Sequence, residues 1–157
     1  MNLQLFLDMD GVLSNFYGHC RTELGPEFAV DQKDPHELFK RIREYGNFYG
    51  TQPLMSDAME LWNAVKHLHP IILSGIPYSV PNVAIQKREW VDRYFGKEVS
   101  LICCLSRDKC RHGRPGDILV DDRLKYSRYW IEMGGEFVLH WSNSETLAVL
   151  RGFGLAV

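Results

Sequence analysis

Short runs of apolar residues recur along the chain, separated by longer stretches in which apolar residues return every three or four positions. The short runs predict buried strands at 3–7, 71–75, 101–104, 118–120 and 137–140. The longer stretches predict helices at 34–45, after Ser56, at 82–95, near 125–133 and from Ser144 onward. Strands that alternate with helices in this way indicate an α/β fold, with a parallel sheet covered by helices on both faces.

The segment 15–52 interrupts the alternation, because it has helical spacing and aromatic residues but no run that predicts a strand. The helix at 34–45 has clear end signals, namely Asp34 as N-cap, Pro35 in the first position, Glu37 in the first turn and Gly46 after the end. We expect 15–52 to form a small helical cap, called the insertion below, and 1–14 with 53–157 to form the core domain. The insertion would lie over the carboxyl ends of the strands, where open α/β sheets bind ligands.

Composition and charge narrow the class of protein. A length of 157 residues, with 45% hydrophobic and 24% charged residues, favours one globular domain with a small insertion. The net charge of -2 argues against duplex nucleic acid or an anionic membrane as the main partner. No apolar run approaches the ~20 residues of a membrane span, and the N-terminus does not resemble a signal peptide. The expected compartment is therefore the cytoplasm.

The cysteines and histidines do not suggest a metal centre. No CxxC pair occurs, and two of the four cysteines are adjacent within an apolar run, so we expect all four to fill the core in a reducing compartment: Cys20, Cys103, Cys104 and Cys110. The six histidines are expected to be structural or exposed, with His19 retained as a candidate because it follows the first polar cluster.

That cluster belongs to a larger set of polar residues that directly follow predicted strands. The set consists of Asp8, Asp10, Ser74, Asp121 and Asp122, with Lys109 in the loop after the third strand. In a parallel sheet these ends meet at one edge. Crowded carboxylates repel each other unless a cation binds between them, and oxygen ligands suit Mg²⁺. A phosphoryl group would supply the negative charge that Lys109 and the Ser74 hydroxyl can meet.

Each residue of the set could also have an ordinary structural role, in a turn, as a solvated lysine or as a helix N-cap. It is their combined order, each following a predicted strand, that indicates a functional site. The motifs F-L-D-M-D-G-V-L, I-I-L-S-G, R-D-K (107–109) and I-L-V-D-D-R (118–123) resemble those of the haloacid-dehalogenase (HAD) superfamily of aspartate-based phosphotransferases. Within it the chain looks most like the 5'(3')-deoxyribonucleotidases, which share D-M-D-G-V-L-x-x-F and the helix end W-V-x-x-Y-F-G (90–96). The resemblance covers residues 3 to about 123 and implies a HAD-like Rossmannoid core.

The resemblance also implies a role for each residue of the set. Asp8 would be the nucleophile that becomes an aspartyl-phosphate, and Asp10 the general acid and then the general base. Phosphate would be bound by Ser74, Gly75 and Lys109. Mg²⁺ would be held by Asp8, the backbone carbonyl of Asp10, Asp122 and, directly or through water, Asp121.

Aromatic residues of the insertion are the candidates for substrate contact. Phe16 matches the aromatic residue that packs beside the nucleotide in those nucleotidases, although a single phenylalanine here could equally be core. The aromatic cluster that holds the base is only partly represented, by Tyr17, Phe48 and Tyr49.

The leading hypothesis is a Mg²⁺-dependent phosphatase acting on a small phosphomonoester, favouring nucleoside monophosphates, as a monomer or homodimer. Two enzymatic alternatives are a HAD phosphatase for another metabolite and one for a nucleic-acid end. From a different class, a receiver-type signalling domain also combines clustered Asp, Ser/Thr and Lys on an α/β sheet. A catalytically silent phosphate-binding protein of HAD type is the remaining alternative.

Overall fold

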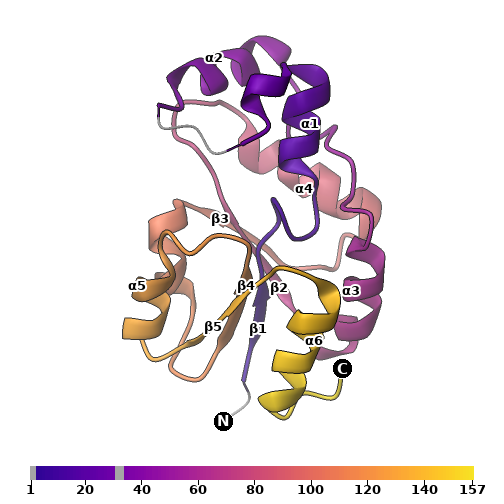
Figure 1. The fold of residues 1–157 in the computed structure, drawn as a ribbon, viewed down its shortest axis with the longest axis vertical. Coiled ribbons are helices and arrows are strands. Elements are labelled where there is room, and N and C mark those ends of the chain that lie inside the picture. Colours follow the sequence, from indigo (N-terminus) through magenta and orange to yellow (C-terminus); the bar gives the residue numbers. More distant parts are fainter. Residues whose placement is uncertain (1–2, 31–33) are drawn as a thin grey trace.

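The computed structural model describes residues 3–30 and 34–157, and its centre is a five-stranded parallel sheet in the order β3-β2-β1-β4-β5 (Figure 1). The strands are β1 (Leu5–Leu7), β2 (Ile71–Gly75), β3 (Leu101–Cys104), β4 (Ile118–Asp121) and β5 (Glu136–Leu139). The chain runs outward from β1 to β3 and then returns to place β4 on the other side of β1. The strand order therefore reverses between β1 and β4, the type of point at which open α/β sheets bind ligands.

The central strand shows why this sequence forms a sheet buried on both faces. Leu5 and Leu7 join the larger hydrophobic cluster, with residues of α3, α4 and α6. Phe6, between them, points to the opposite face and packs edge-on against Trp130 of α5, with ring centroids 5.3 Å apart. Successive side chains of a strand alternate between faces, so an all-apolar run requires cover on both. The predicted fold class is confirmed.

The helices of the core are α3 (Ala58–Val65), α4 (Val83–Tyr94), α5 (Ser127–Glu132) and α6 (Asn143–Gly152). Short 3-10 turns lie at η2 (Lys66–Leu68) and η3 (Ser106–His112). The terminal helix was expected to open at Ser144, but it opens at Asn143. The reason is that Ser142 acts as the N-cap and its hydroxyl accepts a hydrogen bond from the Glu145 amide at 3.3 Å.

The insertion contains α1 (Phe16–Glu23), the 3-10 turn η1 (Pro26–Phe28) and α2 (His36–Tyr45). Helix α2 begins later than its end signals predicted, with Pro35 and not Asp34 as the N-cap. Asp34 Oδ1 instead accepts from the backbone N–H of His36 at 3.1 Å, which closes a turn just before the helix.

Figure 1 shows α1 and α2 beyond the end of the sheet at which the chain leaves β1. Their apolar side chains form a separate cluster that also takes in the start of α4, with Cys20, Phe28, Leu38, Ile42, Phe48, Tyr49, Val80 and Val83. The two ends of the insertion meet, since the N–H of Asn15 donates to the carbonyl of Pro53 at 2.8 Å. The domain limits themselves stay a prediction.

The structure also bears on the cysteines and on the membrane-span expectation. Cys20 is buried in the insertion and the other three cysteines are partly buried; all four are free thiols. None of the helices found in 3–30 and 34–157 has the length and apolar character that crossing a bilayer requires.

Candidate active site

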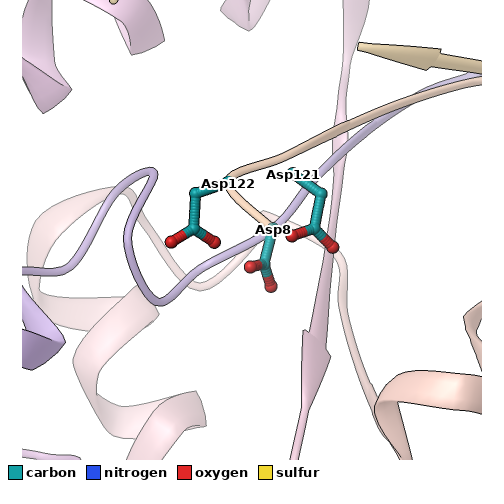
Figure 2. Close-up of side chains that lie close together, drawn as sticks. All are labelled: Asp8, Asp121 and Asp122. Atoms are coloured by element: carbon teal, nitrogen blue, oxygen red, sulfur yellow. The ribbon is translucent and has the colours of Figure 1, made fainter. Parts of the chain in front are cut away.

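Three carboxylates converge where β1 and β4 end (Figure 2). The two strands are paired in parallel, and the Asp8 amide donates to the carbonyl of Val120 at 2.8 Å, so Asp8 lies beside Asp121 and Asp122. One carboxylate oxygen from each of the three aspartates lies within 4.8 Å of the others. Asp8 and Asp121 are buried. The sheet therefore brings together three of the acids that sequence spacing assigned to one edge.

Lys109 is the cation of this cluster. It comes from η3, is itself buried, and its Nζ lies 2.8 Å from Asp8 Oδ1 and 2.8 Å from Asp121 Oδ2. Burial alone would lower the pKa of Lys109, but the carboxylates of Asp8 and Asp121 outweigh it and hold that pKa above its usual value. The lysine predicted from the R-D-K motif is therefore charged and bridges two of the aspartates.

One ammonium does not compensate three acids. Burial, followed by the charge of Asp121, raises the pKa of Asp8 to about 7 in spite of Lys109. Burial, followed by the charges of Asp8 and Asp121, raises the pKa of Asp122 to about 8. Asp122 Oδ1 is buried without a hydrogen-bond partner. Together these features describe a site that lacks positive charge and offers an unshared oxygen ligand.

The donor set fits a hard divalent cation. Asp8 and Asp122 are the best placed ligands, because both oxygens of Asp121 are already engaged: Oδ2 by Lys109 and Oδ1 by the amide of Arg123 at 3.0 Å. Gly11 permits the close approach of its loop to Asp122. Its φ of 84° and the lack of a Cβ both matter, since a Cβ at this position would overlap the Asp122 carboxylate.

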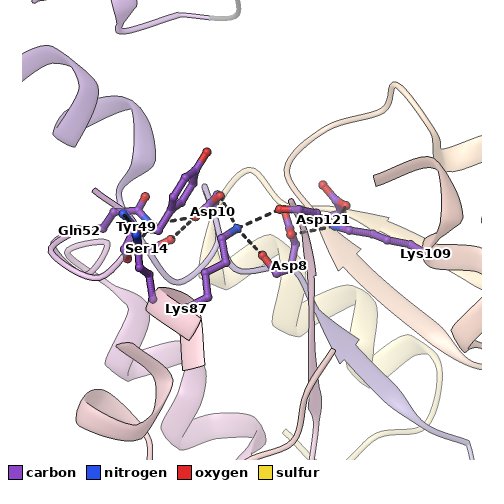
Figure 3. Close-up of polar contacts among 11 residues, drawn as sticks. Asp8, Asp10, Ser14, Tyr49, Gln52, Lys87, Lys109 and Asp121 are labelled. Carbon is purple, nitrogen blue, oxygen red and sulfur yellow. Dashed lines mark hydrogen bonds and ion pairs between the residues drawn. The ribbon is translucent and has the colours of Figure 1, made fainter. Parts of the chain in front are cut away.

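Asp10 lies outside the acidic cluster and has its own set of donors (Figure 3). Its Oδ1 accepts from the Ser14 hydroxyl at 2.8 Å and from Gln52 Nε2 at 3.2 Å. Its Oδ2 accepts from Lys87 Nζ at 2.9 Å. The side chain remains 24% exposed, facing the cavity described below. Asp10 therefore has different side-chain partners from Asp8, although the two are only two residues apart.

Ser74 and Gly75, the predicted phosphate-binding pair, end β2 on the same side of the sheet. Lys87 Nζ lies 2.7 Å from Ser74 Oγ and donates to the carbonyl of Gly75 at 2.9 Å. Gly75 lies against Ser106 at the start of η3, where a side chain would overlap the Ser106 hydroxyl. Lys87 thus joins Asp10 to the end of β2.

Sequence reasoning missed three residues of this arrangement: Ser14, Gln52 and Lys87. A signal for Lys87 was present, because it lies four residues from Val83 and from Val91 on the buried stripe of α4. A lysine in the middle of an apolar stripe is costly to bury unless it is paired. Ser14 and Gln52 gave no comparable signal.

A cavity of about 420 Å³ opens above these residues. Its floor includes Asp8, Asp10, Lys109, Asp121 and Asp122, and its wall on the side of the insertion includes Phe16, Tyr17 and Tyr49. The rings of Phe16 and Tyr49 are close to parallel, with an interplanar angle of 17° and centroids 6.1 Å apart. The opposite wall carries basic and aromatic side chains, among them Arg107, Lys125 and Tyr126.

Ser74 is fully buried at the end of β2 and does not line the cavity. Two further residues that the sequence suggested for this site, Phe48 and His19, do not line it either. Phe48 is fully buried, because it packs against Phe16, Tyr45 and Tyr49 inside the insertion. His19 is also buried there, with its ring 4.5 Å from that of Phe48 and its Nε2 3.1 Å from Thr51 Oγ1. Both are packing residues in this structure.

Comparison with known proteins agrees with the motifs. No family model matches the chain. A protein of Vibrio phage KVP40 named "Putative 5'(3')-deoxyribonucleotidase" is 28% identical over 145 residues, which cover 90% of this chain and 76% of that protein. A hydrolase from Streptococcus pneumoniae superposes with a TM-score of 0.58 at 11% identity, covering 96% of this chain and all of the other.

A HAD-superfamily hydrolase from Ehrlichia chaffeensis superposes with a TM-score of 0.53 at 12% identity, over 96% of this chain and 95% of its own. The chain therefore has the fold of the HAD-superfamily hydrolases, and the resemblance inferred from its motifs is confirmed. Its sequence is similar to that of the Vibrio phage KVP40 protein named "Putative 5'(3')-deoxyribonucleotidase".

Proposed function

We propose that the protein is a Mg²⁺-dependent phosphomonoester hydrolase that works through an aspartyl-phosphate at Asp8 and favours nucleoside monophosphates. The observation that carries the proposal is the arrangement of Asp8, Lys109 and Asp122 on the floor of a cavity with an aromatic wall. Phosphoryl transfer depends mainly on positioning and on charge neutralisation, which this arrangement supplies. The cytoplasm remains the expected compartment.

The reaction has two steps. In the first, an Asp8 carboxylate oxygen attacks phosphorus, and the ester P–O bond breaks as Asp10 gives its proton to the departing alkoxide. In the second, water attacks phosphorus, Asp10 takes a proton from that water, and the bond between phosphorus and Asp8 breaks to release phosphate. Asp10 is suited to both tasks because its carboxylate faces the cavity apart from the acidic cluster.

The other residues hold the phosphoryl group and its charge. Lys109 lies against Asp8, so its ammonium can offset negative charge on the transferring group. The hydroxyl of Ser74 and the backbone N–H of Gly75 would bind non-bridging oxygens. Asp8, Asp122 and the backbone carbonyl of Asp10, with support from Asp121, would hold Mg²⁺, which would supply charge neutralisation at the phosphate.

The cation site gives a prediction for the pH dependence of stability. In EDTA the protein should lose stability as the pH rises from about 4 to about 8. The folded state binds protons at Asp8 and Asp122 more tightly than the unfolded chain, so protonation of these two carboxyls stabilises the folded state. This stabilisation is complete below the usual carboxyl pKa of 3.8. It is lost as the pH passes through about 7 and about 8.

Adding Mg²⁺ at pH 8 should raise the unfolding temperature, because the ion binds ionised carboxylates that converge only in the folded state. Thermal unfolding at pH 5 and pH 8, in EDTA and in Mg²⁺, measures both effects. Asp122→Asn is the control and should respond less to pH and to Mg²⁺. A parent protein indifferent to Mg²⁺ at pH 8 would contradict the assigned metal site.

The nucleotide preference rests on the aromatic wall. Phe16→Ala should raise KM for nucleoside monophosphates about 5- to 100-fold, since stacking of a base on an aromatic ring contributes about 1–3 kcal/mol. Small phosphomonoesters without a base should be hydrolysed as before. Phosphate release from nucleoside monophosphates and sugar phosphates, for the parent and the variant, measures this.

Phe153→Ala, the same change at a partly exposed residue after α6, is the matched control and should leave both substrate classes unaffected. Poor turnover of every nucleotide by the parent, together with good turnover of another phosphomonoester, would favour the second candidate, a phosphatase for a different metabolite. The basic residues of the opposite wall, such as Arg107 and Lys125, are the observation that favours it, because they suit a further anionic group.

The receiver-type alternative is not supported by the fold. Receiver domains have the strand order 2-1-3-4-5, whereas this sheet has the order 3-2-1-4-5. In addition, the acids of the cluster follow β1 and β4, and β3 ends in Cys104.

A further inference from the structure

Lys87 is a fully buried lysine whose ammonium has a complete set of acceptors. The three protons of the group match three oxygens, Asp10 Oδ2 at 2.9 Å, Ser74 Oγ at 2.7 Å and the carbonyl of Gly75 at 2.9 Å. The ammonium also lies 4.9 Å from the centre of the Tyr49 ring. An apolar side chain of similar length could fill this space without the cost of burying a charge. Packing alone therefore does not explain a lysine here.

Helix α4, which carries Lys87, is hydrogen-bonded to the end of the insertion. Three side chains on this helix bind the end of the insertion: Gln86 Oε1 accepts from the Tyr49 amide at 3.1 Å, Trp90 Nε1 donates to the Gln52 carbonyl at 2.8 Å, and Arg93 Nη1 donates to the Gly50 carbonyl at 2.8 Å. The same segment carries the Gln52 amide that binds Asp10. Lys87 therefore approaches Asp10 from α4 itself, and Gln52 approaches it from a segment that is hydrogen-bonded to α4 (Figure 3).

The site thus contains two buried lysines with separate partners. Lys109 bridges Asp8 and Asp121 in the acidic cluster, and Lys87 bridges Asp10 and the end of β2. The partners of Lys87 are the group assigned to proton transfer and a group assigned to phosphate binding. An ammonium bonded to both fixes the direction of the Asp10 carboxylate relative to the place where phosphate would bind.

We propose that Lys87 is a positioning residue that acts through Asp10, holding its carboxylate where it can transfer a proton to the leaving oxygen. This inference rests on the proposed phosphatase function and adds to it a residue outside the four sequence motifs. It predicts a defect that depends on the leaving group. A role in folding or general packing would slow all substrates alike.

Lys87→Met tests this, because methionine keeps the length of the side chain and removes the charge. Release of the leaving group is measured in a single turnover at saturating enzyme, for a nucleoside monophosphate and for 4-nitrophenyl phosphate. The variant should release the nucleoside about 10- to 100-fold more slowly, since proton transfer by a placed group contributes about 10²–10⁴-fold. Nitrophenolate departs without a proton, so its release should slow less than about threefold. Equal slowing of both would overturn the proposal.

A double-mutant cycle with Asp10→Asn gives an independent measurement. If Lys87 acts through Asp10, Lys87→Met should cost less than about threefold in the Asp10→Asn background. Arg93→Met is the matched control, because Arg93 lies on the same helix and binds the same segment without touching Asp10. Its effect should be the same in both backgrounds. Multiplicative losses for Lys87→Met would refute the positioning role.

Different results would contradict the phosphatase function and the role of Lys87. If the parent releases no phosphate, or Asp8→Asn remains active, the proposed function fails. If the parent is active, Asp8→Asn is inactive and Lys87→Met slows both substrates equally, only the role of Lys87 fails. Thermal unfolding monitors folding of each variant, and Lys87→Gln carries the same comparison if the methionine variant does not fold.

Discussion

Asp8→Asn is expected to reduce phosphate release from a nucleoside monophosphate by about four orders of magnitude or more. An amide oxygen is a poor nucleophile, and removal of the attacking group from an assembled site typically costs losses of that size. The loss should appear in kcat, because Ser74, Gly75 and Lys109 remain to bind the phosphate.

The substitution should not unfold the protein. Asp8 is the acid whose burial and neighbours raise its pKa to about 7, so a neutral side chain relieves repulsion, and Lys109 keeps its bond to Asp121. Asp92→Asn is the matched control, since Asp92 lies on α4 and pairs with Arg88 away from the cavity. It should retain activity. A fully active Asp8→Asn protein would refute the proposed chemistry.

Lys109→Met is expected to affect both activity and stability. Without the ammonium, Asp8 and Asp121 lose their common partner, and leaving buried charge unpaired costs about 3–5 kcal/mol of unfolding free energy. Turnover should fall by about 10³-fold, as is typical when one stabilising group is removed from the transition state.

The loss of stability should depend on pH. In EDTA it should be largest at pH 8 and should shrink at pH 5.5, because Asp8 and Asp122, with pKa values of about 7 and about 8 in the parent, are then protonated. Urea unfolding at the two pH values measures the difference. Lys66→Met, at an exposed lysine whose Nζ donates to Asn63 Oδ1 at 2.9 Å, is the control and should match the parent. An equal loss at both pH values would contradict the electrostatic explanation.

The acidic cluster could be predicted because one rule of topology sufficed. In a parallel sheet the carboxyl ends of strands share an edge, so acids that directly follow Leu7 and Val120 meet there. The order of the strands did not follow from hydrophobic patterning. That order makes β1 and β4 neighbours, and it decides that Asp8 meets Asp122 while Asp10 turns to a different set of partners.

The residues that sequence reasoning misjudged depend on tertiary packing. The aromatic residues of the insertion look alike in the sequence, but Phe48 points into the cluster of the insertion and Tyr49, next to it, reaches the cavity. A lysine on a helix is ordinarily solvated, and only the position of α4 beside Asp10 and Ser74 gives Lys87 its partners. The starts of two helices differ from the prediction because of local contacts: the Ser142 hydroxyl accepts from the Glu145 amide at the start of α6, and Asp34 Oδ1 accepts from the His36 amide just before α2.

The most direct measurement is to locate the covalent intermediate. The protein is quenched in acid during turnover of a nucleoside monophosphate and reduced with borohydride, which converts an aspartyl-phosphate to homoserine, and the peptides are sequenced by mass spectrometry. We predict homoserine at position 8, dependent on substrate, and none at position 10. Rapid phosphate release with aspartate unmodified at position 8 at every quench time, or with the modification at another residue, would contradict Asp8 as the nucleophile.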